Sequence, residues 1–314
     1  MILELVVVVL PVFLVIGAGY AATRTGLFRP SAVDGLMVFT QNFAIPCLLF
    51  RGVATLDLGA VFDARLLASF YTGAVVCFAL GTLGARRLFR RRPGEAVAIG
   101  FGALFSNSVL LGLPIVERAY GGGVLPPTFA IIAIHAPFCY LVGITAMEFA
   151  RADGRRFAGT VRAVANAMFR NALMIGIALG FAVNIADVAL PEPLWGAIDM
   201  MAAAALPAAL FGLGGVLTRY ALRASLAEAS MIAGLSLLVH PAIALVLAAG
   251  VFELPPDFVR AAVVTASMAP GVNAYVFASL YSRGQAQAAS VVLLGTAMCV
   301  VTASGWLALL AHLS

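Results

Sequence analysis

Two stretches decide the fold of this chain: SNSVLLGLPIVERAYG (residues 106–121) and ASMAPGVNAYVFASLYSRG (residues 266–284). Each lies in an apolar run long enough to cross a bilayer, and each combines proline, glycine and asparagine. Proline removes a helical hydrogen bond, and hydrocarbon cannot satisfy the freed backbone groups. A broken helix at membrane depth is therefore tolerated only against protein or a water-filled cavity. Paired breaks in the two halves of a chain are typical of a transporter's substrate site near the membrane midplane.

The composition predicts an integral membrane protein. Of the 314 residues, 63% are hydrophobic and 11% are charged, and the mean hydropathy is +1.05. A soluble domain has about 25% charged residues. Runs of the length that a bilayer requires predict ten transmembrane helices, at Ile2–Ala22, Ser31–Leu49, Leu66–Ala85, Ala96–Ile115, Leu125–Phe149, Ala172–Ile185, Leu194–Leu217, Met231–Phe252, Phe258–Leu280 and Ala286–Leu310. The sixth run is short, and we expect its helix to begin earlier, near Ala163.

The distribution of positive charge predicts the topology. All 19 basic residues are arginine. Alternate connections, counted from the first, hold 15 of them, and the other connections hold Arg51, Arg65, Arg118 and Arg260. The positive-inside rule places the arginine-rich connections in the cytoplasm and both termini outside. The basic pI of 9.3 follows from these loop arginines, which can also contact anionic lipid, so no nucleic-acid partner is indicated.

The two halves of the chain, residues 1–157 and 158–314, resemble each other. At a constant shift of 161 residues, IGAGYAA (16–22) lies over IALGFAV (177–183), and FAIPCLLF (43–50) lies over a similar proline-containing stretch. The matched residues include Gly19 with Gly180, Pro46 with Pro207, Phe50 with Phe211, and Tyr120 with Tyr281. Each half has five predicted helices, an odd number, so the second copy enters the membrane upside down. This arrangement is the inverted repeat of secondary transporters.

Five stretches spread along the whole chain resemble the auxin efflux carrier family. They are NFAIPCLLF (42–50), NSVLLGLPIVERAYG (107–121), LPAALFGLGGVL (206–217), LVHP (238–241) and MAPGVNAYVFASLYSRG (268–284). The last is the most specific. The family includes plant auxin exporters and bacterial carriers proposed to move malate, malonate and similar organic acids. Its members are similar to bile-acid transporter and sodium–proton antiporter folds.

The resemblance implies a particular architecture and mechanism. Helices 1, 2, 6 and 7 would form a scaffold domain, and helices 3–5 and 8–10 a transport domain that moves like an elevator. The broken helices 4 and 9 would cross at their prolines. The implied function is transport, by efflux, of a small carboxylate across the bacterial inner membrane. The long central loop of the plant proteins is replaced here by RADGRRFAGTVR (151–162).

The chemistry of a crossing favours an anion. Each half-helix that begins there carries free N–H donors and about half a positive charge. The amides of Asn107 and Asn273 can hold a substrate carboxylate or cap the freed backbone. Ser108, Tyr275 and, on helix 2, Asn42 are further candidate substrate contacts. The residues expected to shape the breaks are Gly112, Pro114, Pro270 and Gly271.

Buried histidines are functional candidates in a membrane. His135 is a candidate for a proton-linked role, and we expect His240, which precedes Pro241, to bond a freed carbonyl. The four cysteines are widely spaced in apolar segments and form no metal or redox pattern. No cofactor or metal site is predicted.

Other functional classes fit less well. An enzyme would need a nucleophile with its base, a metal cluster or an acidic magnesium motif within the spans, and the sequence has none of these. A channel with this fold is disfavoured by the paired breaks. A sodium-coupled symporter of the bile-acid type is the main alternative. The expected partners are the anion, the lipid bilayer and, through the scaffold domain, a second copy of the chain.

Overall fold

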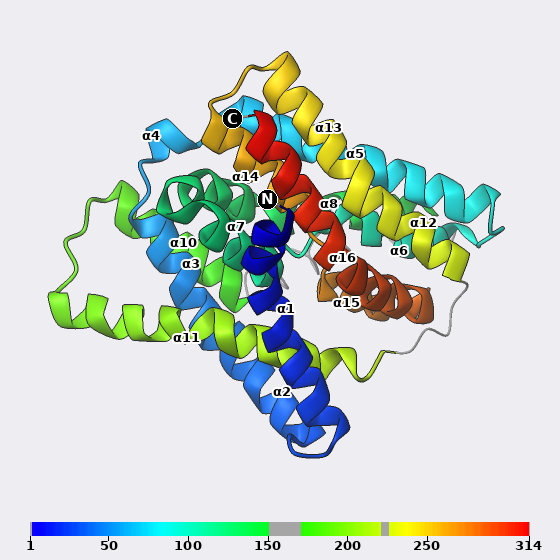
Figure 1. The fold of residues 1–314 in the computed structure, drawn as a ribbon, viewed down its shortest axis with the longest axis horizontal. Helices are drawn as coiled ribbons and strands as arrows, with labels where there is room; N and C mark the ends of the chain where they lie inside the picture. The colour runs from blue at the N-terminus through cyan, green and yellow to red at the C-terminus, as the bar shows by residue number, and fades with distance from the viewer. Residues whose placement is uncertain (1, 151–170, 221–225, 314) are drawn as a thin grey trace. The chain divides into compact units, whose positions relative to one another are not determined.

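The structure is a computed structural model that describes residues 2–150, 171–220 and 226–313. Apart from one isolated bridge, these residues form helices, turns and loops (Figure 1). The helices are α1 (Ile2–Arg24), α2 (Pro30–Phe39), η1 (Thr40–Ala44), α3 (Ile45–Ala54), α4 (Leu58–Val61), α5 (Ala64–Arg87), α6 (Pro93–Leu104), η2 (Ser108–Gly112), α7 (Leu113–Tyr120), η3 (Gly121–Val124), α8 (Leu125–Ala150), α10 (Ala172–Ile185), α11 (Glu192–Leu217), α12 (Leu226–Gly234), η4 (Leu235–Val239), α13 (His240–Leu245), η5 (Val246–Val251), α14 (Pro256–Ala266), α15 (Val272–Leu280) and α16 (Gln285–Leu313).

The helices confirm the predicted class, an all-helical integral membrane protein. Seven continuous helical stretches of the described chain are long and apolar enough to cross a membrane, and the apolar α6 and α10 are shorter. Helix covers each predicted segment, except that the fourth and ninth are interrupted. The helix α10 begins at Ala172; the earlier start expected near Ala163 lies outside the described residues.

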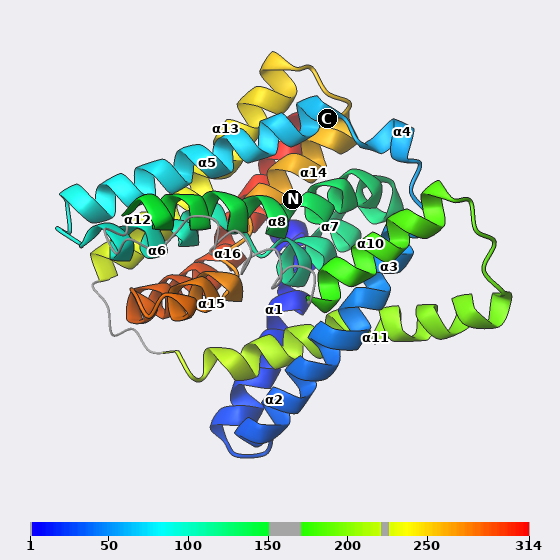
Figure 2. The ribbon, with the colours of Figure 1, turned by 180° about the vertical axis from the view of Figure 1, so that it is seen from behind.

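Three of the helical stretches widen into a π-turn just before a proline. The residue that precedes Pro46, Pro114 or Pro241 donates its N–H five residues back, to the carbonyl of Thr40, Ser108 or Leu235. A proline ring collides with the carbonyl four residues before it in a regular helix, and the wider turn absorbs that collision. As a result, α2, η1 and α3 continue as one helical rod in both views (Figures 1 and 2).

The chain divides into two compact units, which we describe separately. Unit 1 comprises Met1–Leu10, Phe62–Val161 and Tyr220–Ser314, and unit 2 comprises Pro11–Val61 and Arg162–Arg219. Most of α1, with α2, α3, α10 and α11, therefore belongs to unit 2, and the described helices from α5 to α8 and from α12 to α16 belong to unit 1.

In unit 2 the helices approach closely at glycines. A side chain on Gly19 would collide with the carbonyl oxygen of Phe211, and a Cβ on Gly180 would lie 2.8 Å from the carbonyl oxygen of Phe50. The shift of 161 residues found in the sequence relates Gly19 to Gly180 and Phe50 to Phe211, so each contact is the counterpart of the other in the opposite half. Small residues permit such close backbone packing between helices in a membrane, where burial of apolar surface adds little.

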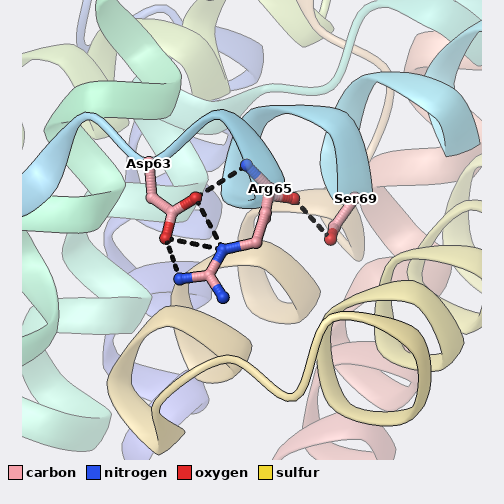
Figure 3. Close-up of polar contacts among 3 residues, drawn as sticks. All are labelled: Asp63, Arg65 and Ser69. Atoms are coloured by element: carbon pink, nitrogen blue, oxygen red, sulfur yellow. Dashed lines mark hydrogen bonds and ion pairs between the residues drawn. The ribbon is translucent and has the colours of Figure 1, made fainter.

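Unit 1 contains the two interrupted segments. It also contains α5, whose N-terminus is capped by Asp63. The carboxylate of Asp63 accepts hydrogen bonds from the backbone N–H and the guanidinium of Arg65 (Figure 3). These hydrogen bonds hold the pKa of Asp63 below its ordinary value. One turn later, Ser69 donates to the carbonyl oxygen of Arg65 over 2.7 Å. The cap fixes the first turn of α5 where this helix begins.

A bidentate ion pair ties the connection between α5 and α6 to α12. Arg91 donates to both carboxylate oxygens of Glu228, over 3.0 and 2.8 Å. The Glu228 side chain is only 1% exposed, whereas that of Arg91 is 30% exposed. The hydrogen bonds to Glu228 raise the pKa of Arg91 above its ordinary value.

Candidate substrate site at the helix crossing

The interruptions of the fourth and ninth predicted segments meet in unit 1. Ser106 and Pro270 form an isolated antiparallel bridge. The N–H of Asn107 donates to the carbonyl of Ala269 over 2.8 Å, and the N–H of Gly271 donates to the carbonyl of Phe105 over 3.0 Å. The two broken segments therefore satisfy part of each other's freed backbone, as buried backbone in a membrane requires.

Asn107 stands at the N-terminus of the second half of its segment. Its side-chain oxygen accepts a hydrogen bond from the N–H of Leu110 over 3.3 Å, which caps η2. The residue is 7% exposed. Because a neutral amide has one acceptor oxygen and one NH₂ group, this contact occupies the oxygen and leaves the NH₂ group as a donor.

Asn273 lies inside the first turn of α15, and its oxygen is also engaged. The hydroxyl of Tyr140, on α8, donates to Asn273 Oδ1 over 3.1 Å. The cap of α15 is Gly271, which has no side chain to satisfy the first N–H groups of the helix. The N-terminus of α15 and the NH₂ group of Asn273 therefore supply hydrogen-bond donors and partial positive charge at one place.

The other residues predicted for the crossing surround the bridge. Ser108 begins η2 and is 2% exposed. A Cβ on Gly271 would lie 3.3 Å from the ring of Phe105, and one on Gly295 of α16 would lie 2.7 Å from Pro270 Cδ. Pro114 lies in the first turn of α7, after the π-turn that ends at Gly112. Proline and glycine therefore shape the break here.

The structure gives Tyr275 of α15 a ring contact and places Asn42 in unit 2. The ring of Tyr275 packs against that of Tyr220, with centroids 5.0 Å apart. Asn42 belongs to unit 2, where it lies exposed on η1, next to the turn that precedes Pro46. The structure brings Asn107, Ser108, Pro270 and Gly271 together at the bridge, but it does not place Asn42 in that unit.

Aromatic rings pack beside the crossing. The ring of Phe101, on α6, stacks on that of Phe277, on α15, with centroids 4.0 Å apart and planes 6° from parallel. Tyr140 contacts both rings and Phe105. This packing fixes the position of the Tyr140 hydroxyl, which reaches Asn273 from within an apolar cluster.

His135 contacts the crossing from α8. Its Nε2 lies 3.1 Å from the carbonyl oxygen of Ser106, the residue that pairs with Pro270. The side chain is 2% exposed. His240 does not bond the freed carbonyl that was expected, because its Nε2 lies 3.0 Å from the carbonyl oxygen of Phe70. That carbonyl belongs to α5 and is not the one freed by Pro241.

Among the described residues, no group of three or more His, Cys, Asp or Glu side chains could hold a metal ion. Tyr140 is the contact of Asn273 that the sequence analysis missed. The available signal was a hydroxyl five residues after His135 in an otherwise apolar span.

The comparisons with known proteins agree with this architecture. A family model described as "Membrane transport protein" matches the chain twice, over residues 5–156 and 155–307. A "Putative malonate transporter" of Rhizobium meliloti (strain 1021) is 27% identical over 309 residues, which are 98% of this chain and 96% of the relative. An "Uncharacterized transporter" of Methanothermobacter thermautotrophicus is 28% identical over 75% of this chain and 76% of its own length.

A third relative, the "Uncharacterized transporter YfdV" of Escherichia coli (strain K12), is 23% identical over 95% of both chains. The family model covers nearly the whole chain, so the resemblance found in the sequence is confirmed. The protein is a membrane transporter and not an enzyme. The chain belongs to the membrane transport protein family, that of the auxin efflux carriers.

Proposed function

We propose that this protein is a secondary transporter for a small organic anion, and that a carboxylate of the substrate binds at the crossing. The observation that carries the proposal is the pairing of Ser106 with Pro270, which brings the two interrupted segments together. Beside it, the amides of Asn107 and Asn273 use their oxygens within the protein and keep their NH₂ groups as donors. A carboxylate accepts several hydrogen bonds at once, so it matches a site built from donors.

The N-terminus of α15 strengthens this match. The helix has nine residues and no side-chain cap. Its first N–H groups lack partners within the helix, and they carry the positive end of the helix dipole. We therefore place the carboxylate nearer to α15 than to η2, whose N-terminus Asn107 already caps. Neutral donors and a dipole suit an anion that must also leave the site again.

The fold we propose is a ten-helix inverted repeat. Paired contacts in both units support it. In unit 2, Gly19 with Phe211 and Gly180 with Phe50 are exchanged by the shift between the halves. In unit 1, Cys139 Sγ lies 3.7 Å from the carbonyl of Leu104, and Cys299 Sγ lies 3.7 Å from that of Ser267. Each thiol thus contacts the end of a half-helix that precedes the crossing, although the residue numbers of the two contacts differ by 160 and 163 and not by 161.

The mechanism we propose is an elevator movement of unit 1 against unit 2. The division of the chain supports it, because unit 1 holds both interrupted segments and unit 2 holds the predicted scaffold helices. Unit 2 also exposes large apolar side chains for lipid or for a second copy in a homodimer, among them Leu14, Phe43, Leu179 and Met200. We further propose that both termini face the outside of a bacterial inner membrane, as the arginine distribution indicates.

The substrate we propose is a small carboxylate such as malonate or malate. The name of the relative from Rhizobium meliloti supports malonate, and its alignment covers 98% of this chain. Efflux is the direction we propose, since an anion of charge −1 gains about 2.3 kcal/mol per 100 mV by leaving a cell that is negative inside.

Counterflow in proteoliposomes tests the function. Vesicles loaded with unlabelled acid should take up the same labelled acid, whereas neutral and cationic solutes should not exchange. The assay should be run with sodium and with sodium replaced by choline. Uptake that requires sodium would favour the symporter alternative, and exchange of cations but of no acid would contradict the proposal.

A further inference from the structure

Unit 1 contains two buried histidines whose rings contact the same phenylalanine. The ring of Phe70 of α5 packs against His135 of α8 and His240 of α13, with ring centroids 5.5 Å and 4.8 Å away respectively. Both histidines are at most 2% exposed. A side chain on Gly73 would come within 2.7 Å of the His240 ring, so the glycine makes room for it on α5.

The hydrogen bonds of the two rings define their protonation pattern. Nε2 of His135 faces the carbonyl of Ser106, and Nε2 of His240 faces the carbonyl of Phe70. A carbonyl oxygen only accepts, so each Nε2 carries a hydrogen and each Nδ1 is the basic nitrogen of a neutral ring. Nδ1 of His135 lies 3.7 Å from the thiol of Cys139. Nδ1 of His240 is buried without a hydrogen-bond partner among the described residues.

A buried acceptor without a partner is destabilising, because it has lost its hydrogen bond to water and gained none in return. One explanation for such a group is a ligand that it binds during part of the transport cycle. The ligand that a basic ring nitrogen takes is a proton. The contact of His135 with Ser106 connects this pair to the crossing, because Ser106 precedes Asn107 and pairs with Pro270.

Within the part of the chain that the structure describes, the surroundings hold no other acid or base that would replace the pair. The other titratable side chains on the described helices packed around it are Arg65, Tyr71, Cys77, Arg86 and Arg87 of α5, Cys139, Tyr140 and Glu148 of α8, Cys299 and His312 of α16, and Asp257 and Arg260, which bond each other on α14. The carboxylates at the ends of these and the neighbouring helices (Asp63, Glu95, Glu117, Glu148 and Asp257) are not buried. Among the described residues, Glu228 is the buried acid, and Arg91 already pairs with it.

We propose that His135 and His240 form a proton-binding site and that one proton crosses the membrane with each substrate anion. This inference rests on the proposed function. The proton adds to the Nδ1 lone pair of one ring, whose Nε2–H keeps its carbonyl partner. The pair holds one proton, because a second imidazolium beside Phe70 would be repelled by the first. Malonate and malate are dianions at neutral pH, so a dianion that moves with one proton keeps a net charge of −1 and is still driven outward by the membrane potential. The proton leaves from Nδ1 on the other side.

The wild-type protein gives the first test. Proteoliposomes with an internal pH dye are supplied with malonate or malate, and the membrane potential is clamped with potassium and valinomycin. Each acid molecule taken up should bring one proton into the vesicle, in addition to any proton that the acid itself releases there. Vesicles without protein calibrate that release. A gradient of one pH unit should drive about tenfold accumulation of the acid. Uptake without proton movement would overturn the inference and leave the proposed function intact.

Variants locate the site. His135→Gln and His240→Gln each keep an NH donor that can reach the carbonyl but lose the basic nitrogen. Both should abolish the tenfold accumulation, and an unchanged Tm in detergent shows that each variant is folded. His312→Gln is the matched control, because His312 lies exposed in the last turn of α16, and it should behave as wild type. Full accumulation in both site variants would overturn the assignment. If the wild-type protein shows no counterflow of any acid, the proposed function itself is contradicted.

Discussion

The hydroxyl of Tyr140 donates a hydrogen bond to Asn273 Oδ1 over a distance of 3.1 Å. The two residues are 133 positions apart and come from the fifth and ninth predicted helices. Because the hydroxyl occupies the amide oxygen, it determines which way the NH₂ group of Asn273 points. Tyr140 is thus a positioning residue for the donor that we assign to the substrate carboxylate.

Replacing Tyr140 with phenylalanine should weaken substrate binding. The ring packing against Phe101 and Phe277 is retained, and a neutral hydrogen bond contributes about 1 kcal/mol. The Kd for the acid should therefore rise about fivefold, while the Tm in detergent changes little. Titration calorimetry and a thermal melt measure the two quantities. A lowered Tm with unchanged Kd would assign Tyr140 a purely structural role.

Asn107→Ala should act mainly on stability. The substitution removes the side-chain cap of η2, and loss of an N-cap costs about 1 kcal/mol in the free energy of unfolding. Asn107→Ser is the matched variant, because it restores a capping oxygen without the NH₂ donor and adds no charge. If the NH₂ group binds substrate, the Ser variant melts as wild type but binds the anion poorly. Normal binding by the Ser variant would restrict Asn107 to capping.

Two glycines on α1 should respond differently to the same change. A Cβ on Gly19 would collide with the backbone of Phe211, whereas one on Gly17 would meet nothing within 4 Å. Gly19→Ala should lower the Tm, because forced overpacking costs about 1–3 kcal/mol. Gly17→Ala should leave it unchanged or slightly raised, as alanine favours helix. Equal melting of the two variants would show that α1 does not approach α11 as described.

Replacing one partner of the ion pair between Arg91 and Glu228 should lower the stability of the protein strongly. Arg91→Ala leaves a buried carboxylate without its partner, at a cost of about 3 kcal/mol. Arg65→Ala breaks the more exposed pair with Asp63 and should lower the Tm much less, since solvent screens an exposed ion pair. Thermal melts of both variants in one detergent make the comparison. Similar losses would contradict the burial of Glu228.

The helix breaks could be predicted from sequence because proline and membrane depth act locally. Pro114 and Pro270 interrupt apolar runs, and hydrocarbon forbids unsatisfied backbone there. The family resemblance could be seen in the same stretches. The π-turns before Pro46, Pro114 and Pro241 could not be predicted, since a proline in a helix can equally produce a kink or an end.

The difference between the two asparagines could not be predicted either. Both stand beside a broken helix in the sequence, which made them look equivalent. In the structure Ser106 faces Pro270, so Asn107 precedes its helix and caps it, whereas Asn273 lies within α15. The oxygen of Asn273 then depends on Tyr140, which comes from another span. Such a partner is set by tertiary packing, on which local sequence carries no information.

Counterflow of labelled malonate, compared between wild type and Asn273→Ala, tests the central claim most directly. If the crossing binds the carboxylate, wild-type vesicles exchange the acid. The variant should insert and melt normally but require a ten- to hundredfold higher concentration, since an amide that holds a buried partner contributes about 1–3 kcal/mol. Wild-type exchange with unchanged affinity and unchanged Tm in the variant would contradict the site.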